Sequence, residues 1–375
     1  MKYYIIAGEA SGDLHGSNLI KELKKKDVAA DIRCWGGDKM EAAGATLVKH
    51  YKELAFMGFL EVLKNLGTIL KNIKICKADI LQYQPTTLIL IDYPGFNLRI
   101  AKWAKAQQIQ VIYYISPQVW AWKENRVKLI KTCVNKMLVI LPFEKDFYKK
   151  WHYDVEYVGH PLVEVVDDFL LHVDRNAFPN EPQITGIIAL LPGSRQQEIL
   201  KKLPIMLAVA RHFPEYQFIV AKAPGLDDSF YTELLAPYKN VSSVVNKTYD
   251  LLVHAKAALV TSGTATLETA LFAVPQVICY KGSEFSYQIA KRLIKIKFIG
   301  LVNLIMDKPV VTELIQDALT IENLKTELNL LLTNNIKQRQ IKADYESLKT
   351  LLSKGGHASA NAAESIYGYL TRLPQ

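Results

Sequence analysis

Short runs of β-branched and other apolar residues alternate along the chain with longer segments in which apolar residues recur every three or four positions. In the first half, the runs that predict strands cover residues 3–7, 32–35, 87–91, 111–115 and 137–141. A second series follows at residues 187–191, 218–221, 241–245, 258–261 and 277–280. Strands that alternate with helices form parallel sheets, so the pattern predicts an α/β protein of two doubly wound, Rossmann-like domains.

The periodic pattern lapses between the two series, after Val158-Gly159-His160-Pro161-Leu162 and through an acidic, irregular stretch. We therefore predict a first domain at residues 1–163 and a second at 164–355. Near the end of the chain, Gly355 and Gly356 can end one helix and Ser359 can begin another. We expect residues 356–375 to form a helix that crosses back to the first domain. Ligands of doubly wound sheets bind beyond the carboxyl ends of the strands, which here would face a central cleft.

Two loops of the second half suit the binding of a diphosphate, because each follows a strand and opens a helix. The residues concerned are Gly193, Ser194 and Arg195 in one loop and Ser262, Gly263 and Thr264 in the other. Free N–H groups at the helix start and the Arg195 guanidinium can bind phosphate, and Glu268 can accept hydrogen bonds from a ribose. The alternative is two plain turns with a hydroxyl cap. Neither loop has the GxGxxG or P-loop spacing, which argues against dehydrogenase and kinase chemistry.

The first half carries candidates for proton transfer at the ends of two predicted strands. Glu9, Asp13 and His15 lie in the loop that follows the first strand, and Asp92 follows the third. Removing a proton from a sugar hydroxyl needs a carboxylate or an imidazole, so Asp92 and His15 are the two candidates for the general base. The alternative is structural, with Asp13 and Asp92 as helix caps. Ser11, in the first loop, is predicted to contact the donor.

Apolar residues gather at two further places. Trp120 and Trp122 follow the fourth strand, where aromatic rings suit sugar faces or acyl chains, although packing of one of them in the core is the alternative. Residues 56–73 are more apolar than a surface helix usually is and carry lysines at intervals, which is typical of an interfacial membrane helix. A buried crossover helix is the alternative. The predicted membrane-facing side chains are Phe56, Met57, Phe59, Leu60 and Leu63.

Composition narrows the class of protein only slightly. The formal charge of +9 over 375 residues attracts nucleic acid, lipid headgroups and phosphorylated small molecules alike. No zinc module or aromatic-basic binding pattern accompanies that charge, so we expect no nucleic-acid partner. The four cysteines form no CxxC pair, and no secretion signal or spanning apolar run is present, so we expect a cytoplasmic protein with peripheral membrane contact. No metal or other cofactor is expected.

Together these motifs resemble those of the lipid-A-disaccharide synthase family, which has the GT-B glycosyltransferase fold. The likeness covers residues 8–16, 92–97, 116–123, 159–162, 191–195 with Glu198, 262–268 and Asn303. Departures from the family pattern fall at Tyr93, Gly95, Lys123 and Val302 and concern the acceptor side more than the donor side.

The resemblance implies transfer of 2,3-diacylglucosamine from UDP to the primary hydroxyl of 2,3-diacylglucosamine 1-phosphate (lipid X), with inversion and without a metal. The products would be the beta-1',6-linked lipid A disaccharide 1-phosphate and UDP. The resemblance also implies that Arg195, Glu268 and Asn303 bind the donor nucleotide and that Asp92 is needed for activity. It places the protein on the cytoplasmic face of a Gram-negative inner membrane, and a homodimer is possible.

A hydrolysing UDP-sugar epimerase of GT-B fold is the rival interpretation. It would share the nucleotide-binding loops but would need no lipid acceptor. The apolar segment at residues 56–73 favours the transferase, because an epimerase has no use for a membrane-facing patch.

Overall fold

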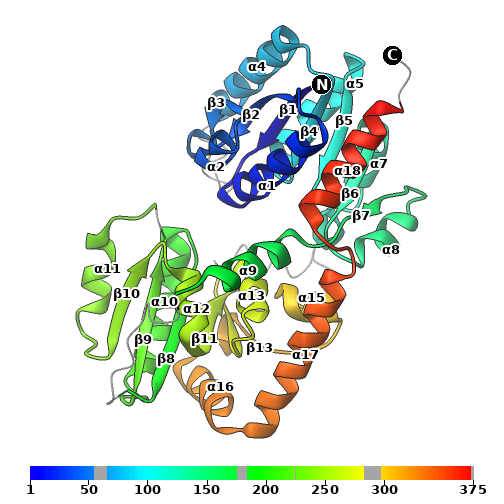
Figure 1. Ribbon diagram of the computed structural model, residues 1–375. Helices are drawn as coiled ribbons and strands as arrows, with labels where there is room; N and C mark the ends of the chain where they lie inside the picture. Colours follow the sequence, from blue (N-terminus) through cyan, green and yellow to red (C-terminus); the bar gives the residue numbers. More distant parts are fainter. Residues whose placement is uncertain (55–65, 175–183, 224, 283–296, 373–375) are drawn as a thin grey trace. The chain divides into compact units, whose positions relative to one another are not determined.

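The computed structural model describes residues 1–54, 66–174, 184–223, 225–282 and 297–372 (Figure 1). The chain forms two compact units. The N-terminal unit comprises Met1–Pro161 and Leu352–Gln375, and the C-terminal unit comprises Leu162–Leu351. These divisions fall within a few residues of the boundaries expected from the sequence.

The N-terminal unit is built on a parallel sheet with the strand order β3-β2-β1-β4-β5-β6-β7. The strands are β1 (Lys2–Ala7), β2 (Asp31–Gly36), β3 (Thr46–His50), β4 (Thr87–Ile91), β5 (Gln110–Tyr114), β6 (Lys136–Val139) and β7 (Glu156–Tyr157). The helices are α1 (Ala10–Lys26), α2 (Asp38–Ala42), α4 (Leu66–Tyr83), α5 (Pro94–Ala106), α6 (Val119–Trp122), α7 (Arg126–Cys133), α8 (Glu144–Lys149) and α18 (Ala358–Thr371), with a 3-10 turn at Tyr51–Glu53. The strand order changes direction between β1 and β4, and ligands of doubly wound sheets bind at such switch points.

The C-terminal unit repeats this plan with the strand order β10-β9-β8-β11-β12-β13. The strands are β8 (Gly186–Leu191), β9 (Tyr216–Lys222), β10 (Val241–Val245), β11 (Ala255–Thr261), β12 (Gln276–Tyr280) and β13 (Thr312–Ile315). The helices are α9 (Pro161–His172), α10 (Gln196–Ala210), α11 (Asp228–Leu235), α12 (Thr248–His254), α13 (Thr264–Leu271), α15 (Leu301–Met306), α16 (Ile321–Thr333) and α17 (Asn335–Ser353), with a 3-10 turn at Gln316–Ala318. Its switch point lies between β8 and β11.

The predicted strands are confirmed, and their buried faces explain why they were recognisable. Every residue of β4 is buried, as are five of the six in β1, because helices cover both faces of a parallel sheet. The sequence prediction missed β3, β7 and β13, which lie at sheet edges, and β7 has only two residues, one exposed and one partly buried. Their residues are mostly only partly buried and mix polar with apolar side chains, so the continuous apolar run is absent there.

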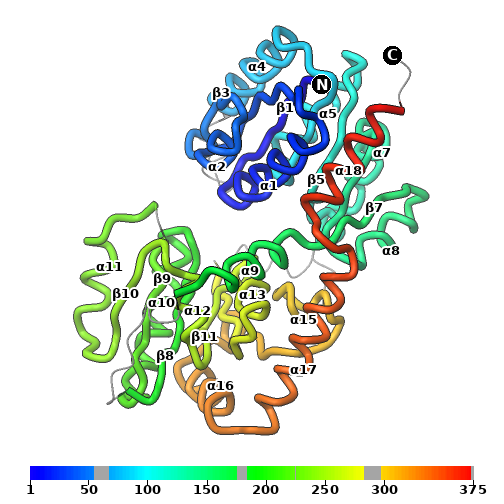
Figure 2. Tube along the Cα trace, viewed as in Figure 1, coloured from blue at the N-terminus to red at the C-terminus, as the bar shows by residue number. Residues whose placement is uncertain are grey.

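The last helix belongs to the N-terminal unit, where α18 packs against α1. The trace in Figure 2 runs from the red α18 back through α17 into the C-terminal unit. The connection between α17 and α18 requires glycine at position 355, because a Cβ there would lie only 2.4 Å from the Gly159 nitrogen. Among the helices of the described ranges, none combines the length and the apolarity needed to cross a membrane.

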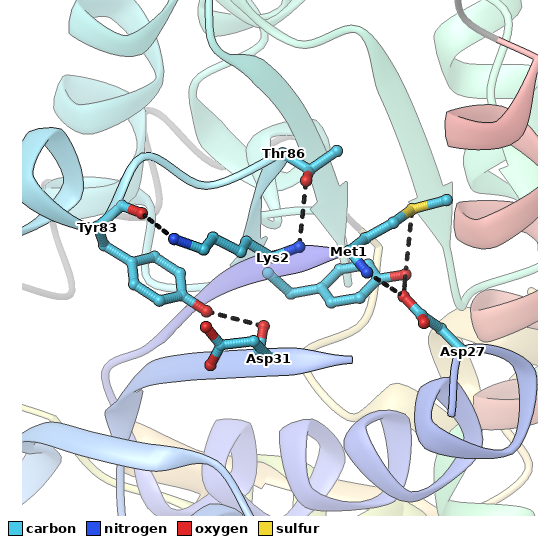
Figure 3. Close-up of polar contacts among 7 residues, drawn as sticks. Met1, Lys2, Asp27, Asp31, Tyr83 and Thr86 are labelled. Carbon is cyan, nitrogen blue, oxygen red and sulfur yellow. Dashed lines mark hydrogen bonds and ion pairs between the residues drawn. The ribbon is translucent and has the colours of Figure 1, made fainter. Parts of the chain in front are cut away.

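Polar contacts fasten the amino end of the N-terminal sheet, opposite the switch-point loops (Figure 3). The Met1 nitrogen donates to Asp27 at 2.7 Å, and the Tyr83 hydroxyl donates to the Asp31 carbonyl at 2.8 Å. The Lys2 amide donates to the Thr86 hydroxyl at 3.1 Å. These bonds stabilise the amino end of β1, beside the amino ends of its parallel neighbours. The carboxyl end of β1 lies at the opposite edge of the sheet and continues into the next loop.

Candidate active site

Asp92 follows β4 in a turn with an unusual backbone. Asp92 and Tyr93 have positive φ angles of 41° and 48°, a left-handed conformation that is uncommon for residues other than glycine. The Asp92 carbonyl accepts hydrogen bonds from the Asn97 amide at 2.8 Å and the Tyr113 hydroxyl at 2.5 Å. The Tyr93 ring covers Gly8, where a Cβ would lie 2.4 Å from it. The turn is therefore held from several sides, which fixes Asp92 at the switch point of the N-terminal sheet.

The Asp92 carboxyl has a strongly raised pKa. Burial, and to a smaller extent the charge of Glu9, raise it to about 7. Glu9 stands at the start of α1, directly after β1, and β1 and β4 are neighbours in the sheet. Two of the predicted proton-transfer candidates, Glu9 and Asp92, thus lie close enough for the charge of one to act on the other. A carboxyl with this pKa is suited to general base catalysis near neutral pH.

The other predicted ionisable residues of this loop have different surroundings. Asp13 is buried and accepts backbone N–H bonds from Gly37 at 2.8 Å, Met40 at 3.0 Å and Lys39 at 3.2 Å. It caps the α2 turn, so the geometry favours the structural alternative over proton transfer. Burial lowers the pKa of His15 to about 4, which makes its imidazole a weaker base than Asp92.

Ser11, predicted to contact the donor, lies in the first turn of α1 and is exposed.

The first predicted phosphate loop follows β8, at the switch point of the C-terminal sheet. Gly193 has a φ of +111°, Ser194 is exposed, and Arg195 is the N-cap residue of α10 with a side chain that is 54% exposed. The Arg195 guanidinium lies 3.3 Å from one Glu198 oxygen. The other Glu198 oxygen lies 3.8 Å from the ammonium of Lys202, which is buried. A carboxylate thus stands between two cations beside a loop that can receive a phosphate.

The second predicted phosphate loop follows the neighbouring strand β11. Gly263 and Thr264 are exposed at the start of α13, and the Ser262 hydroxyl donates to the Ile299 carbonyl at 2.9 Å. Glu268, one turn into the helix, accepts a 2.6 Å hydrogen bond from the Tyr249 hydroxyl. Burial raises the pKa of Glu268, and this hydrogen bond opposes the rise. Both loops therefore lie at one edge of one sheet, with a cation in the first and an oriented carboxylate in the second.

The Asn303 side chain serves the packing of the C-terminal unit. Asn303 is fully buried, and its amide donates to the Val311 carbonyl at 2.8 Å and to Glu313 at 2.9 Å. Its side-chain oxygen accepts from the Val311 nitrogen at 2.9 Å. With its polar atoms engaged in this way, Asn303 joins α15 to β13, and the geometry does not support the predicted direct contact with the nucleotide.

The two tryptophans of the predicted acceptor site differ. Trp120 is 8% exposed and packs edge-on against Phe143 with ring centroids 5.0 Å apart, so it belongs to the core. Trp122 is 50% exposed. The structure thus corrects the prediction for Trp120, whose ring is held in the core and has little surface for a ligand. The predicted membrane-facing residues Phe56, Met57, Phe59, Leu60 and Leu63 lie outside the described residues.

Sequence reasoning missed four residues that support this site. Tyr113 and Asn97 hold the Asp92 carbonyl, and Tyr249 holds Glu268. No sequence pattern near Tyr113 or Tyr249 indicates these bonds, because each joins separate elements. Lys202 offered a signal, since it follows Arg195 and Glu198 at the spacing that places residues on one helix face.

Two doubly wound sheets with phosphate-suited loops at a switch point are typical of the GT-B fold. Among solved structures, the calicheamicin glycosyltransferase CalG4 is similar, with a TM-score of 0.64 and 17% identity, covering 100% of this chain and 99% of that chain. The UDP-GlcNAc 2-epimerase from Neisseria meningitidis is similar with a TM-score of 0.68 and 12% identity, covering 100% of both chains. Likeness at such low identity establishes the fold alone, which agrees with the predicted class.

Sequence comparison distinguishes between these two kinds of enzyme. The model of the lipid-A-disaccharide synthetase family matches residues 3–367, and the chain belongs to this family. The lipid-A-disaccharide synthase of Geobacter metallireducens is 40% identical over 358 residues, covering 94% of this chain and 93% of the relative. That of Coxiella burnetii is 37% identical over 374 residues, covering 98% of both. The protein is therefore a glycosyltransferase of lipid A disaccharide synthesis, and the epimerase interpretation is not favoured.

Proposed function

We propose that this protein joins UDP-2,3-diacylglucosamine to 2,3-diacylglucosamine 1-phosphate by one displacement with inversion, giving the beta-1',6-linked disaccharide 1-phosphate and UDP. Asp92 carries the proposal, because it combines a fixed position at a switch point with a pKa of about 7. As the acceptor's primary hydroxyl attacks the anomeric carbon, Asp92 accepts its proton. The bond from that carbon to the UDP oxygen breaks, and its electrons leave with UDP.

The charge that develops on the leaving diphosphate needs stabilisation. Arg195 supplies an exposed guanidinium, and the starts of α10 and α13 supply backbone N–H groups. These donors are the protein's own, and the proposal therefore includes no metal ion. Glu268 accepts hydrogen bonds from the ribose.

The rival epimerase chemistry is tested by the dependence on acceptor. Purified protein is incubated with UDP-diacylglucosamine, with and without the acylated acceptor, and UDP, disaccharide and free sugar are quantified. We expect UDP and disaccharide in equal amounts, and negligible UDP when the acceptor is left out. UDP release at the same rate without acceptor would overturn the transferase proposal.

The proposed location is the cytoplasmic face of the inner membrane, where the protein would encounter a donor that carries two acyl chains. Support comes from the apolar segment of the sequence at residues 56–73. Sedimentation with vesicles of inner-membrane lipids, compared for the wild type and for Phe59→Ser, tests this. Equal binding by both proteins would remove that segment from the membrane contact.

Replacing Tyr249 by phenylalanine tests the ribose contact. The bond from Tyr249 orients one Glu268 oxygen, so we expect its loss to weaken UDP binding about 3- to 10-fold. The same substitution should weaken the binding of 2'-deoxy-UDP less than that of UDP, because 2'-deoxy-UDP lacks a ribose hydroxyl that Glu268 would bind. Tyr231→Phe is the matched control, since its hydroxyl accepts from the Ala223 nitrogen elsewhere in the same unit. An equal loss for both nucleotides would indicate a general structural effect instead.

A further inference from the structure

One exposed indole in the N-terminal unit is shared by two cations. The Lys123 ammonium nitrogen lies 4.0 Å from the centroid of the Trp122 ring, and the Arg126 guanidinium carbon lies 5.8 Å from the same centroid. Both distances are in the range of cation–π contacts. Trp122 ends α6 and Arg126 begins α7, so a short connection presents all three side chains together. We call this group the Trp122 cluster.

The positive charge of the Trp122 cluster is not balanced within the part of the chain that the structure describes. No carboxylate there lies within ion-pair distance of Lys123 or Arg126, and Glu124 between them forms no ion pair. Partial burial and the charge of Arg126 lower the pKa of Lys123. Two like charges held close together favour an anion between them.

The Trp122 cluster belongs to the same sheet edge as Asp92. The cluster follows β5, which pairs with β4. Ile115, directly after β5, accepts a hydrogen bond from the Asp92 nitrogen at 3.2 Å. The Tyr113 hydroxyl donates to the Asp92 carbonyl, and burial raises the pKa of this hydroxyl; the charge of Asp92 adds to the rise and the charge of Arg126 opposes it. The cluster and the proposed base are therefore within electrostatic reach of one hydroxyl.

We propose that the Trp122 cluster binds the phosphate monoester of the acceptor. A monoester carries a charge of about −1.5 to −2 at neutral pH, which two cations match. Arg126 can bind two phosphate oxygens with its planar fork, Lys123 adds a point charge, and the exposed indole packs on the sugar beside the phosphate. This inference rests on the proposed function, in which the acceptor is a sugar 1-phosphate. It names the residues that distinguish the phosphorylated acceptor from an uncharged one.

The test compares the phosphorylated acceptor with the same acylated sugar lacking its phosphate, both in neutral detergent micelles. We expect Lys123→Met and Arg126→Gln each to raise KM for the phosphorylated acceptor about 10- to 100-fold. KM for the unphosphorylated acceptor and for the UDP-sugar should stay unchanged. Lys128→Met is the matched control, because this exposed lysine on α7 makes no contact with the Trp122 ring in the described structure. We expect that control to behave as the wild type.

Two results would overturn the proposal. An equal rise of KM for both acceptors would mean that the cluster does not bind the phosphate. An unchanged KM, together with weaker binding of the variants to phosphatidylglycerol vesicles, would assign the cluster to the membrane surface.

Direct binding keeps this test separate from the proposed function. Glucosamine 1-phosphate is titrated against the protein by tryptophan fluorescence, with Trp122→Phe identifying the responding ring. If the wild type made no disaccharide, the proposed function would fail. Binding that is lost in Lys123→Met and Arg126→Gln would still establish the phosphate site, and equal binding by all variants would refute it.

Discussion

Replacing Asp92 by asparagine should lower kcat by about two to four powers of ten, the usual contribution of a general base. Asparagine keeps the size of the side chain and tolerates the left-handed backbone that Asp92 adopts, but it cannot accept the proton of the acceptor hydroxyl. UDP binding should be nearly unchanged, because the nucleotide loops belong to the C-terminal unit. Steady-state rates and UDP titration of the same preparation measure the two effects.

The pH profile adds a second readout for Asp92. Because its pKa is raised to about 7, the ionised base becomes more abundant as pH rises through that value. The wild-type rate should therefore increase between pH 6 and 8 and level off above, and the variant should lose this rise. Asp154→Asn, which changes an exposed carboxylate of the same unit, is the control. A variant with wild-type rates would transfer the role of base to His15.

Replacing Arg195 by alanine should weaken UDP binding about 10- to 100-fold, as expected for the loss of charge-assisted hydrogen bonds to a diphosphate. The side chain is more than half exposed and its ion pair with Glu198 is long, so the fold should be little affected. Binding of uridine, which has no phosphate, should stay as it is. Calorimetric titration with both ligands separates the two effects.

Arg211→Ala is the matched control for Arg195, because Arg211 lies just past the end of the same helix and its guanidinium lies over the Tyr238 ring. This variant should bind UDP like the wild type. Unaltered UDP affinity in Arg195→Ala would remove Arg195 from the nucleotide site.

The sequence was sufficient to predict most strands of the two sheets and the loops that follow them. Buried parallel strands leave continuous apolar runs, and the topology then places Asp92 and Arg195 at switch points. The edge strands β3, β7 and β13 were missed because little of each is buried. Local pattern thus predicts an element best where helices cover both of its faces.

Side-chain roles were harder to predict, because they depend on contacts between distant segments. Asp13 and Asn303 carry the right groups for a site, yet their polar atoms are bound to Gly37 and Val311. Conversely, the sequence does not distinguish Tyr249 from an ordinary aromatic residue, although its hydroxyl donates a hydrogen bond to Glu268. A polar residue in a motif can bind a ligand only if the fold has left its polar atoms accessible, and sequence spacing alone does not contain that information.

We propose that main-chain amides and Arg195, without a metal ion, stabilise the leaving diphosphate. The most direct test follows disaccharide and UDP formation from the proposed substrates in excess chelator. We predict an undiminished rate, with one UDP released for each disaccharide formed. Loss of turnover in chelator that magnesium restores would contradict the account.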